Sequence, residues 1–232
     1  MDLSIIWESL PRLLGGTVLT IQITALSLVI GLAFAVPFAL MRLSRNPLIR
    51  LPVYGYIFYF RGTPLLVQLF LIYYGSGQFQ EFLDRVGLWV FFREAYFCAV
   101  LTLTLNTAAY TAEILRGAIQ GVPHGEVEAG RALGMSGPLL YRRIILPKAF
   151  RLALPAYTNE VVFLLQATSL VSIITLLDLT GVARIIVARS FEPYKLYIAA
   201  GLIYLVITYG FVFVSRRVEH RLSAHLRERP PH

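Results

Sequence analysis

Two ionisable side chains stand inside long apolar stretches of the sequence. Arg61 interrupts the stretch 51–74, and Glu160 interrupts the stretch 152–177. A charged side chain in hydrocarbon costs about 2.5–3.5 kcal/mol or more, so such residues face a partner or a path for polar solutes. A carboxylate can hold a cationic group, and a guanidinium can hold a carboxylate. The two residues could therefore bind a charged solute, or bind each other.

Their depth in the apolar stretches is similar. At 1.5 Å per helical residue, Arg61 lies about 15 Å and Glu160 about 12 Å from the starts of their stretches, and Asn106 lies about 15 Å into a third stretch, entered from the opposite side. All three fall in one middle layer. In one interpretation Arg61 and Glu160 form an ion pair, or bond to backbone carbonyls, and merely pack the helices. In the other this layer borders a substrate path, whose candidate residues are Glu160, Arg61, Asn106, Asn159, Gln166, Thr168 and Ser169.

The stretches that carry these residues are suited to a bilayer. Of the 232 residues, 57% are apolar and only 15% are charged, and the mean hydropathy is +0.67. A soluble domain has about 25% charged residues, and a transmembrane helix needs about 20 apolar residues. The sequence therefore predicts an all-α polytopic membrane protein, in which residues 1–232 form a single domain. We expect five transmembrane helices, at approximately 13–41, 51–74, 95–115, 152–177 and 196–215.

The net charge of +8 is distributed by topology. Segments 42–50, 116–151 and 216–232 hold 14 Lys and Arg residues, whereas the alternate connections hold six. Excess positive charge marks the cytoplasmic side, so we expect the N-terminus outside and the C-terminus inside. This alternation, without a nucleic-acid-binding motif, argues against a nucleic-acid partner. The single cysteine, Cys98, excludes an intrachain disulfide and a zinc site of several thiolates, and we expect no metal site.

The cytoplasmic segment at approximately 120–148 is longer than a plain connection needs. A short helix over 126–133 is expected to end at Gly134, because glycine commonly follows the last helical turn. Ser136 can cap a second short helix, which Pro147 is expected to interrupt before the fourth transmembrane helix. One interpretation is a pair of helices that rests on lipid headgroups.

A motif in this segment favours another interpretation. Residues 128–134 read Glu-Ala-Gly-Arg-Ala-Leu-Gly, and after nine further residues 144–147 read Ile-Ile-Leu-Pro. This resembles the EAA loop of the permease subunits of binding-protein-dependent ABC importers. The one departure is Gly130, where the pattern has a second alanine, and glycine weakens a helix by about 1 kcal/mol. The resemblance implies that the loop contacts a cytoplasmic ATPase through Glu128, Ala129, Arg131, Ala132, Leu133 and Gly134.

Other stretches narrow the resemblance. Residues 60–68, 106–113, 122–125 and 154–160 are similar to the polar amino acid branch of that family, and the likeness extends over roughly residues 10–222. Within the branch the chain resembles the M-type permeases for histidine, lysine, arginine and ornithine, and for opines such as octopine and nopaline. The resemblance implies the type I ABC importer transmembrane fold and import of basic amino acids or opines. An importer of glutamine or another polar amino acid is the alternative.

The resemblance also implies partners. These are a sister permease, two ABC ATP-binding subunits and a periplasmic substrate-binding protein, assembled in the bacterial inner membrane. The chain has no Walker A sequence, so we expect ATP and Mg²⁺ on the partner ATPase, no cofactor on this chain and no enzymatic activity of its own. A stand-alone carrier or channel is the less favoured alternative, and it would transport without ATP. An intramembrane enzyme would need a catalytic motif such as Gly-x-Ser-x-Gly, which the sequence lacks.

Overall fold

Long apolar helices make up most of the molecule. The computed structural model describes residues 4–222. Within them, four helical runs are long and apolar enough to cross a membrane, or five when a bent pair, α2 and α3, is counted as one span. The four runs are α1 (Ser4–Arg42), α6 (Ala95–Gln120), the run Gly137–Ile174, and α11 (Pro193–Leu222).

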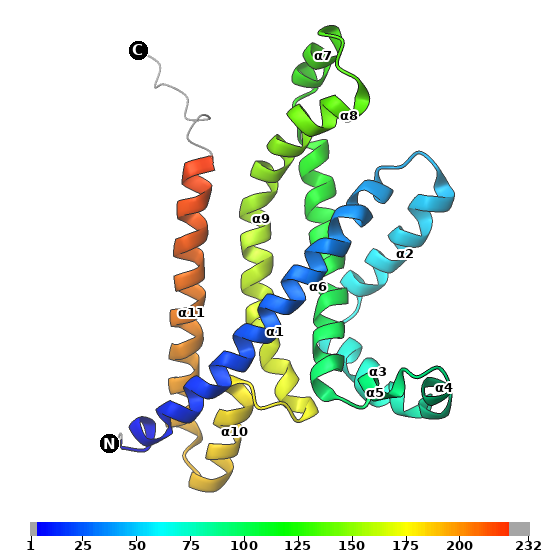
Figure 1. Cartoon of the computed structure of the whole chain (residues 1–232). Coiled ribbons are helices and arrows are strands. Elements are labelled where there is room, and N and C mark those ends of the chain that lie inside the picture. Colours follow the sequence, from blue (N-terminus) through cyan, green and yellow to red (C-terminus); the bar gives the residue numbers. More distant parts are fainter. Residues whose placement is uncertain (1–3, 223–232) are drawn as a thin grey trace, which may run out of the picture.

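The helices alternate in direction, so their connections gather at two ends (Figure 1). At one end lie α7 (His124–Ala132), α8 (Gly137–Leu140), the connection from α1 to α2 and the last turns of α11. α1 begins at the opposite end. The segments that the charge count assigns to the inner side therefore share one end, although Arg227 and Arg229 lie outside the described residues. The other end also holds α4 (Gln80–Arg85), α5 (Trp89–Phe92) and α10 (Leu179–Ser190).

The second expected span is a bent pair of helices. α2 (Pro47–Gly62) and α3 (Leu65–Gln78) meet at an angle of 105°. Pro64 stands between them and has no backbone N–H, and Thr63 before it is extended, with φ −115° and ψ 146°. Residues before proline favour this extended conformation. We call residues 62–65 the elbow, because they turn the chain and leave backbone carbonyls for side chains to satisfy.

The interruption expected at Pro147 is wrong. α8, the π-helical turn η1 (Tyr141–Ile145) and α9 (Leu146–Ala167) follow one another without a break, and a 3-10 segment, η2 (Thr168–Ile174), continues from α9. Proline has no N–H, and its ring clashes with a carbonyl one turn back in a regular α-helix. Within η1 the Leu146 N–H bonds to the Tyr141 carbonyl, five residues back. This wider turn accommodates Pro147.

The principal packing lies between α1 and α6. A Cβ atom added at Gly31 would lie 2.5 Å from Cγ2 of Thr107, so only glycine allows this approach without a shift. Along the same helix, the hydroxyls of Thr17, Thr20 and Thr24 donate to carbonyls four residues back. These bonds satisfy the polar groups of α1 internally, as an apolar medium requires.

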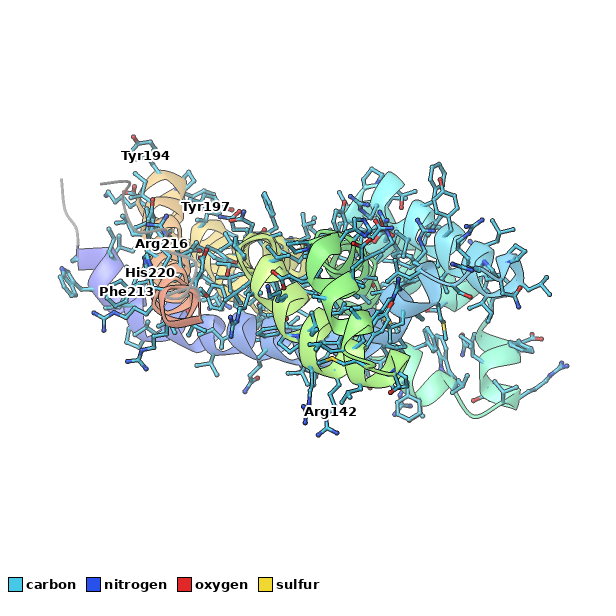
Figure 2. The ribbon with its side chains drawn as sticks, turned by 90° about the horizontal axis from the view of Figure 1, so that it is seen from above. Arg142, Tyr194, Tyr197, Phe213, Arg216 and His220 are labelled. Carbon is cyan, nitrogen blue, oxygen red and sulfur yellow. The ribbon has the colours of Figure 1, made fainter. Side chains whose placement is uncertain are left out.

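The outer face of α11 is apolar and largely exposed. Figure 2 shows this helix at one edge of the molecule, with Tyr194, Tyr197 and Phe213 along it and Arg216 and His220 near its end. Tyr194 is 71% exposed, and only 17% of the most apolar stretch of the helix is buried against the rest of this chain. Such a face suits a bilayer or another apolar helix.

The base of α11 is fixed to α10 by a buried carboxylate. Asp178 is fully buried and caps α10, because its two oxygens accept hydrogen bonds from the backbone N–H groups of Gly181 and Thr180, at 3.0 and 3.2 Å. The hydroxyl of Tyr204 on α11 donates to the same carboxylate at 3.2 Å. This cap orders the end of the molecule opposite α7.

Candidate functional site

A buried pair of amides holds the elbow against α6. Gln68 is 2% exposed, and its Nε2 donates to the carbonyls of Phe60 and Thr63, at 2.9 and 3.1 Å, and to the Thr63 hydroxyl at 2.8 Å. Its Oε1 accepts a hydrogen bond from Nδ2 of Asn106 at 2.9 Å. Gln68 thus supplies the donors that the carbonyls lost where the helix breaks.

Glu160 projects from α9 toward α6. Its side chain is 8% exposed, and Oε1 accepts a hydrogen bond from the Thr107 hydroxyl at 2.9 Å. Thr107 is itself 1% exposed and lies against Gly31 of α1. Because α1 leaves Thr107 no room to move back, the carboxylate is held at a fixed place on the wall between the helices.

Asn106 and Glu160, which accept or donate these hydrogen bonds with Gln68 and Thr107, border one pocket of about 660 Å³. The size lies within the usual range for small-molecule sites, about 300–1,000 Å³. Its walls come from three places: the elbow, α6 and α9. Polar groups on the walls are one carboxylate, two amides and two hydroxyls, and the remaining wall is mostly apolar. Such a site suits a small polar solute with a cationic group. The polar lining residues are Thr63, Asn106, Tyr110, Asn159 and Glu160.

Arg61 lies beside this pocket, and within residues 4–222 it forms no ion pair with Glu160. Its guanidinium lies over the ring of Tyr110, 5.3 Å from the centroid, in a cation–π contact. It borders a second pocket, of about 390 Å³, together with Arg42 and Glu113. Tyr110 borders both pockets. The Arg61–Glu160 ion pair, one interpretation of the sequence, is therefore not formed. Arg61 contacts the ring of Tyr110, whereas Glu160 bonds to Thr107.

The remaining path candidates do not line either pocket. Gln166 is exposed on the last turn of α9. Thr168 is fully buried, and its hydroxyl donates to the Leu165 carbonyl at 2.6 Å. The carbonyl of Ser169 accepts a hydrogen bond from the Ser172 hydroxyl at 2.8 Å. Of the seven candidates, Asn106, Asn159 and Glu160 therefore line the larger pocket, and Arg61 lies next to it. The other three candidates lie outside both pockets.

Two residues of the site escaped the sequence argument. Gln68 and Thr107 are polar side chains within apolar stretches, and both are almost fully buried. An unpaired polar group in an apolar environment costs free energy, and this argument singled out Arg61 and Glu160. The same argument applies to Gln68 and Thr107. Polarity inside an apolar stretch was thus the signal that could have found them.

The turn after α7 has the geometry that the sequence predicted. Gly134 has φ +75°, in the left-handed region that favours glycine. Its N–H bonds to the Arg131 carbonyl at 2.9 Å, and the N–H of Met135 bonds to the Gly130 carbonyl at 3.1 Å. These two bonds form a Schellman motif, and the predicted glycine cap is confirmed. Ser136 stands at the N-cap of α8, but its side chain makes no capping hydrogen bond.

α7 has an anchored face and an outward face. Gly130 is buried, and a Cβ atom there would lie 2.5 Å from Cδ1 of Leu140 and 2.7 Å from Cδ1 of Ile144. An ion pair between Glu126 and Lys148 ties the first turn of α7 to α9. The departure from the motif therefore sits on the anchored face. The opposite side of α7 and the turn after it hold the exposed residues Glu128, Ala129, Arg131, Ala132, Leu133 and Gly134, which we call together the outward face of α7.

The long apolar helices are those of a polytopic helical membrane protein. The sequence profile described as the binding-protein-dependent transport system inner membrane component matches residues 27–224, and the chain belongs to this family. Within the described residues, no group of three or more His, Cys, Asp or Glu side chains could hold a metal ion.

Its relatives are transport permeases. The chain is 50% identical over 229 residues to the nopaline transport system permease protein NocM of Agrobacterium fabrum, covering 99% of this chain and 95% of the relative. It is 43% identical over 217 residues to the histidine/lysine/arginine/ornithine transport system permease protein HisM of Escherichia coli, covering 94% and 91%. Both relatives are named as permease proteins of transport systems.

Solved structures agree on the fold. The crystal structure of an amino acid ABC transporter with histidines superimposes with a TM-score of 0.85 at 36% identity, covering 95% of this chain and 99% of that one. The MetNI methionine ABC transporter, at 20% identity, superimposes with a TM-score of 0.76 over 96% and 99% of the two chains, and it shows the fold alone. The predicted type I importer transmembrane fold is confirmed.

Proposed function

We propose that this chain is the membrane-spanning subunit of an ATP-driven, binding-protein-dependent importer of basic amino acids or opines. It lies in the bacterial inner membrane with its N-terminus outside, and residues 1–232 form one permease domain. Import of glutamine or another polar amino acid is the alternative.

The observation that carries the substrate assignment is the placement of Glu160. A single carboxylate stands in an otherwise uncharged pocket, and a cationic amino group or guanidinium is the partner that it can pair with at least cost. Asn106 and Asn159 on the same walls can bond the polar groups of an amino acid. NocM and HisM, named for nopaline and for basic amino acids, support this class of substrate.

The energy for transport comes from partners. In this proposal the outward face of α7 docks on one of two ABC ATPases, which bind ATP and Mg²⁺. A sister permease forms the other half of the path, most simply as a heterodimer, and a periplasmic substrate-binding protein delivers the solute. Leu133 supports the docking surface, because it is 78% exposed and the other residues of the segment 128–134 are charged or small. An apolar side chain so placed suits a partner protein.

The assembly is tested first by isolation. We expect a tagged chain, extracted from its native membranes in mild detergent, to retain an ABC ATPase and a second permease, identified by mass spectrometry. The recovered complex, reconstituted in proteoliposomes with its binding protein, should take up labelled arginine or histidine only with ATP inside. Isolation of the chain alone under several mild conditions, or uptake that needs no ATP, would contradict the proposal and favour a stand-alone carrier.

A further inference from the structure

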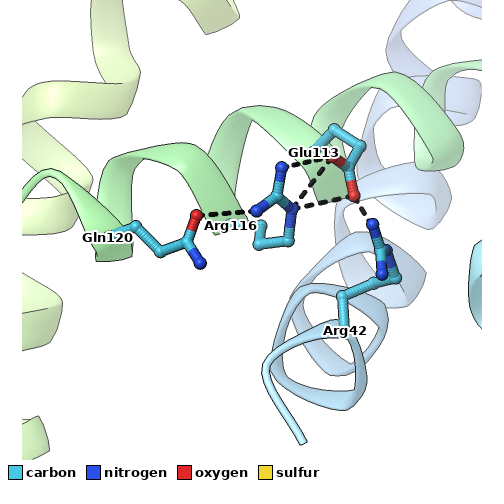
Figure 3. Close-up of polar contacts among 4 residues, drawn as sticks. All are labelled: Arg42, Glu113, Arg116 and Gln120. Carbon is cyan, nitrogen blue, oxygen red and sulfur yellow. Dashed lines mark hydrogen bonds and ion pairs between the residues drawn. The ribbon is translucent and has the colours of Figure 1, made fainter. Parts of the chain in front are cut away.

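Three charged side chains meet where α1, α2 and α6 come together, at the end that carries α7. Figure 3 shows Glu113 of α6 between Arg42, the last residue of α1, and Arg116. The Arg42 Nε lies 3.0 Å from Oε1 of the carboxylate, and the Arg116 Nη2 lies 2.8 Å from Oε2. Arg116 also donates to Gln120 at 2.6 Å, within the last turn of α6. We call Arg42, Glu113 and Arg116 the clasp.

The two arginines hold different parts of the molecule. The Arg116–Glu113 pair joins residues three apart on one helix. The Arg42–Glu113 bond, in contrast, joins residues 71 apart in sequence that lie on two different helices, α1 and α6. The guanidinium of Arg42 also lies over the ring of Tyr54 on α2, 4.7 Å from its centroid. Arg42 therefore links α1, α2 and α6 at one point.

This link is shielded from water. The side chains of Arg42 and Glu113 are 14% and 12% exposed, and that of Arg116 is 27% exposed. Ion pairs at an open surface contribute little, whereas a hydrogen-bonded pair removed from water is strongly sensitive to the loss of one partner. Breaking the Arg42 bond should therefore have a measurable effect on how α1 and α2 sit against α6.

α2 also bonds directly to α6 in its second half. The clasp reaches α2 only through the ring of Tyr54, and two residues further on the hydroxyl of Tyr56 donates to the Leu105 carbonyl. At its far end, Asn106 bonds to Gln68, which in turn bonds to the Phe60 carbonyl. α2 and α6 are thus joined through Arg42 at Tyr54, directly at Tyr56 and through the amides at Phe60, and the elbow, which forms one wall of the larger pocket, lies at the end of α2.

α6 also leads directly to the ATPase-facing loop, since it ends at Gln120 and α7 begins at His124. We propose that Arg42 and Glu113 are positioning residues for transport: they make α2 move with α6, so that a displacement of α7 reaches the elbow. The inference deepens the proposed function, on which it rests. It predicts that loss of the cross-helix bond lowers the amount of solute moved per ATP, rather than solute binding.

The matched variants are Arg42→Gln and Arg116→Gln. Each removes one arginine and leaves Glu113 paired with the other, but only Arg42→Gln breaks the link between helices. In proteoliposomes of the whole complex we expect Arg42→Gln to lower the arginine taken up per ATP hydrolysed by about 5- to 10-fold, and Arg116→Gln by less than about 2-fold. The pair Arg42→Glu with Glu113→Arg should recover most of the ratio that either single reversal loses.

Equal effects of the two glutamine variants, or a double reversal no better than its parts, would overturn the inference. Hydrogen exchange gives a second readout that does not require transport. Arg42→Gln should raise amide exchange in residues 47–54 of the purified complex, and Arg116→Gln should not; unchanged exchange in Arg42→Gln would overturn the inference equally. Absence of ATP-driven uptake by the unaltered complex contradicts the proposed function instead, while the exchange comparison still decides on the clasp.

Discussion

In the pocket between the elbow, α6 and α9, polar side chains bond to one another, whereas on the outward face of α7 they point away from the chain. Glu160 accepts from Thr107, and Asn106 bonds to Gln68. The exposed residues of this face include Glu128 and Arg131, together with Leu133 at the C-cap of α7, which is 78% exposed. The difference indicates that this chain alone preorganises the pocket, whereas under the proposed function the exposed face of α7 is a docking surface for a partner.

The two regions should therefore fail differently when altered. A change on α7 should leave the fold and the pocket as they are and disturb energy transfer. A change in the pocket should alter solute recognition or the local packing and leave docking intact. The following variants test that separation, from the largest expected effect to the smallest.

The largest effect is expected for Gly134→Asp. The left-handed φ costs a non-glycine residue about 1–2 kcal/mol, least for Asn and Asp, and nothing lies within 4 Å of the added Cβ atom. The chain should therefore still insert, but a carboxylate now stands on the docking face. We expect ATP-driven uptake to fall more than about 10-fold.

A matched control is available at the opposite end. Gly87 has φ +72° and equally open surroundings, so Gly87→Asp carries the same backbone cost and the same charge. Membrane yield and uptake should be measured for both variants. Normal uptake by Gly134→Asp, or an equal loss in Gly87→Asp, would contradict a special role for the α7 turn.

The next effect is expected for Glu160→Gln. The amide keeps the shape of the side chain and can still accept from Thr107, but it removes the charge. Hydrogen bonds to charged groups contribute about 1.5–3 kcal/mol, which corresponds to about 10- to 100-fold in affinity for a cationic substrate. Uptake of arginine should fall accordingly, whereas that of the uncharged glutamine should change little. Unchanged arginine affinity, with normal insertion, would exclude the contact.

A moderate effect is expected for Gln68→Leu. The substitution removes the donor of the Thr63 carbonyl, and it leaves Asn106 Nδ2 and the Phe60 carbonyl only the long bond of 3.4 Å between them. Each buried polar group left unpaired costs about 1–3 kcal/mol. We expect a lower melting temperature of the detergent-solubilised chain together with reduced uptake. Asn159→Leu, at an exposed position of the pocket wall, is the control and should keep the melting temperature of the unaltered chain. A melting temperature of Gln68→Leu equal to that of the unaltered chain would contradict the role of Gln68.

The smallest effect is expected for Gly130→Ala, which restores the alanine of the motif. The added methyl group meets the ends of Leu140 and Ile144, which are flexible and can shift. Alanine also favours the helix by about 1 kcal/mol, which offsets this crowding. Uptake should stay within about 2-fold of the unaltered chain. A large loss would mean that the anchored face of α7 is part of the docking surface.

Local chemistry made some of these features predictable. A glycine after a short helix indicated the left-handed turn at Gly134, and the apolar stretches indicated the helices. Prolines were less informative about where helices end. Pro64 lies at a bend of 105°, whereas Pro147 follows a π-helical turn and the helix continues through it. The difference arises from neighbours: Gln68 satisfies the elbow carbonyls, and η1 widens to accept the ring.

The pairing of the polar residues was beyond local sequence. Asn106 and Gln68 are 38 residues apart, and Thr107 and Glu160 are 53 apart. Spacing along one helix shows which residues share a face, but it does not show which helices become neighbours. Arg61 illustrates this, since its depth matched that of Glu160 and its contact is nevertheless with Tyr110.

The most direct test of separate roles compares Gly134→Asp with Glu160→Gln in one reconstituted complex, recording uptake of arginine and glutamine and the ATPase rate with the loaded binding protein. The account predicts that Gly134→Asp loses the stimulation of ATPase by the loaded binding protein and the uptake of any substrate. Glu160→Gln should keep that stimulation and lose preference for the cationic substrate. If both variants lowered the same quantity to the same extent, the division into a preorganised pocket and a partner-completed loop would be contradicted.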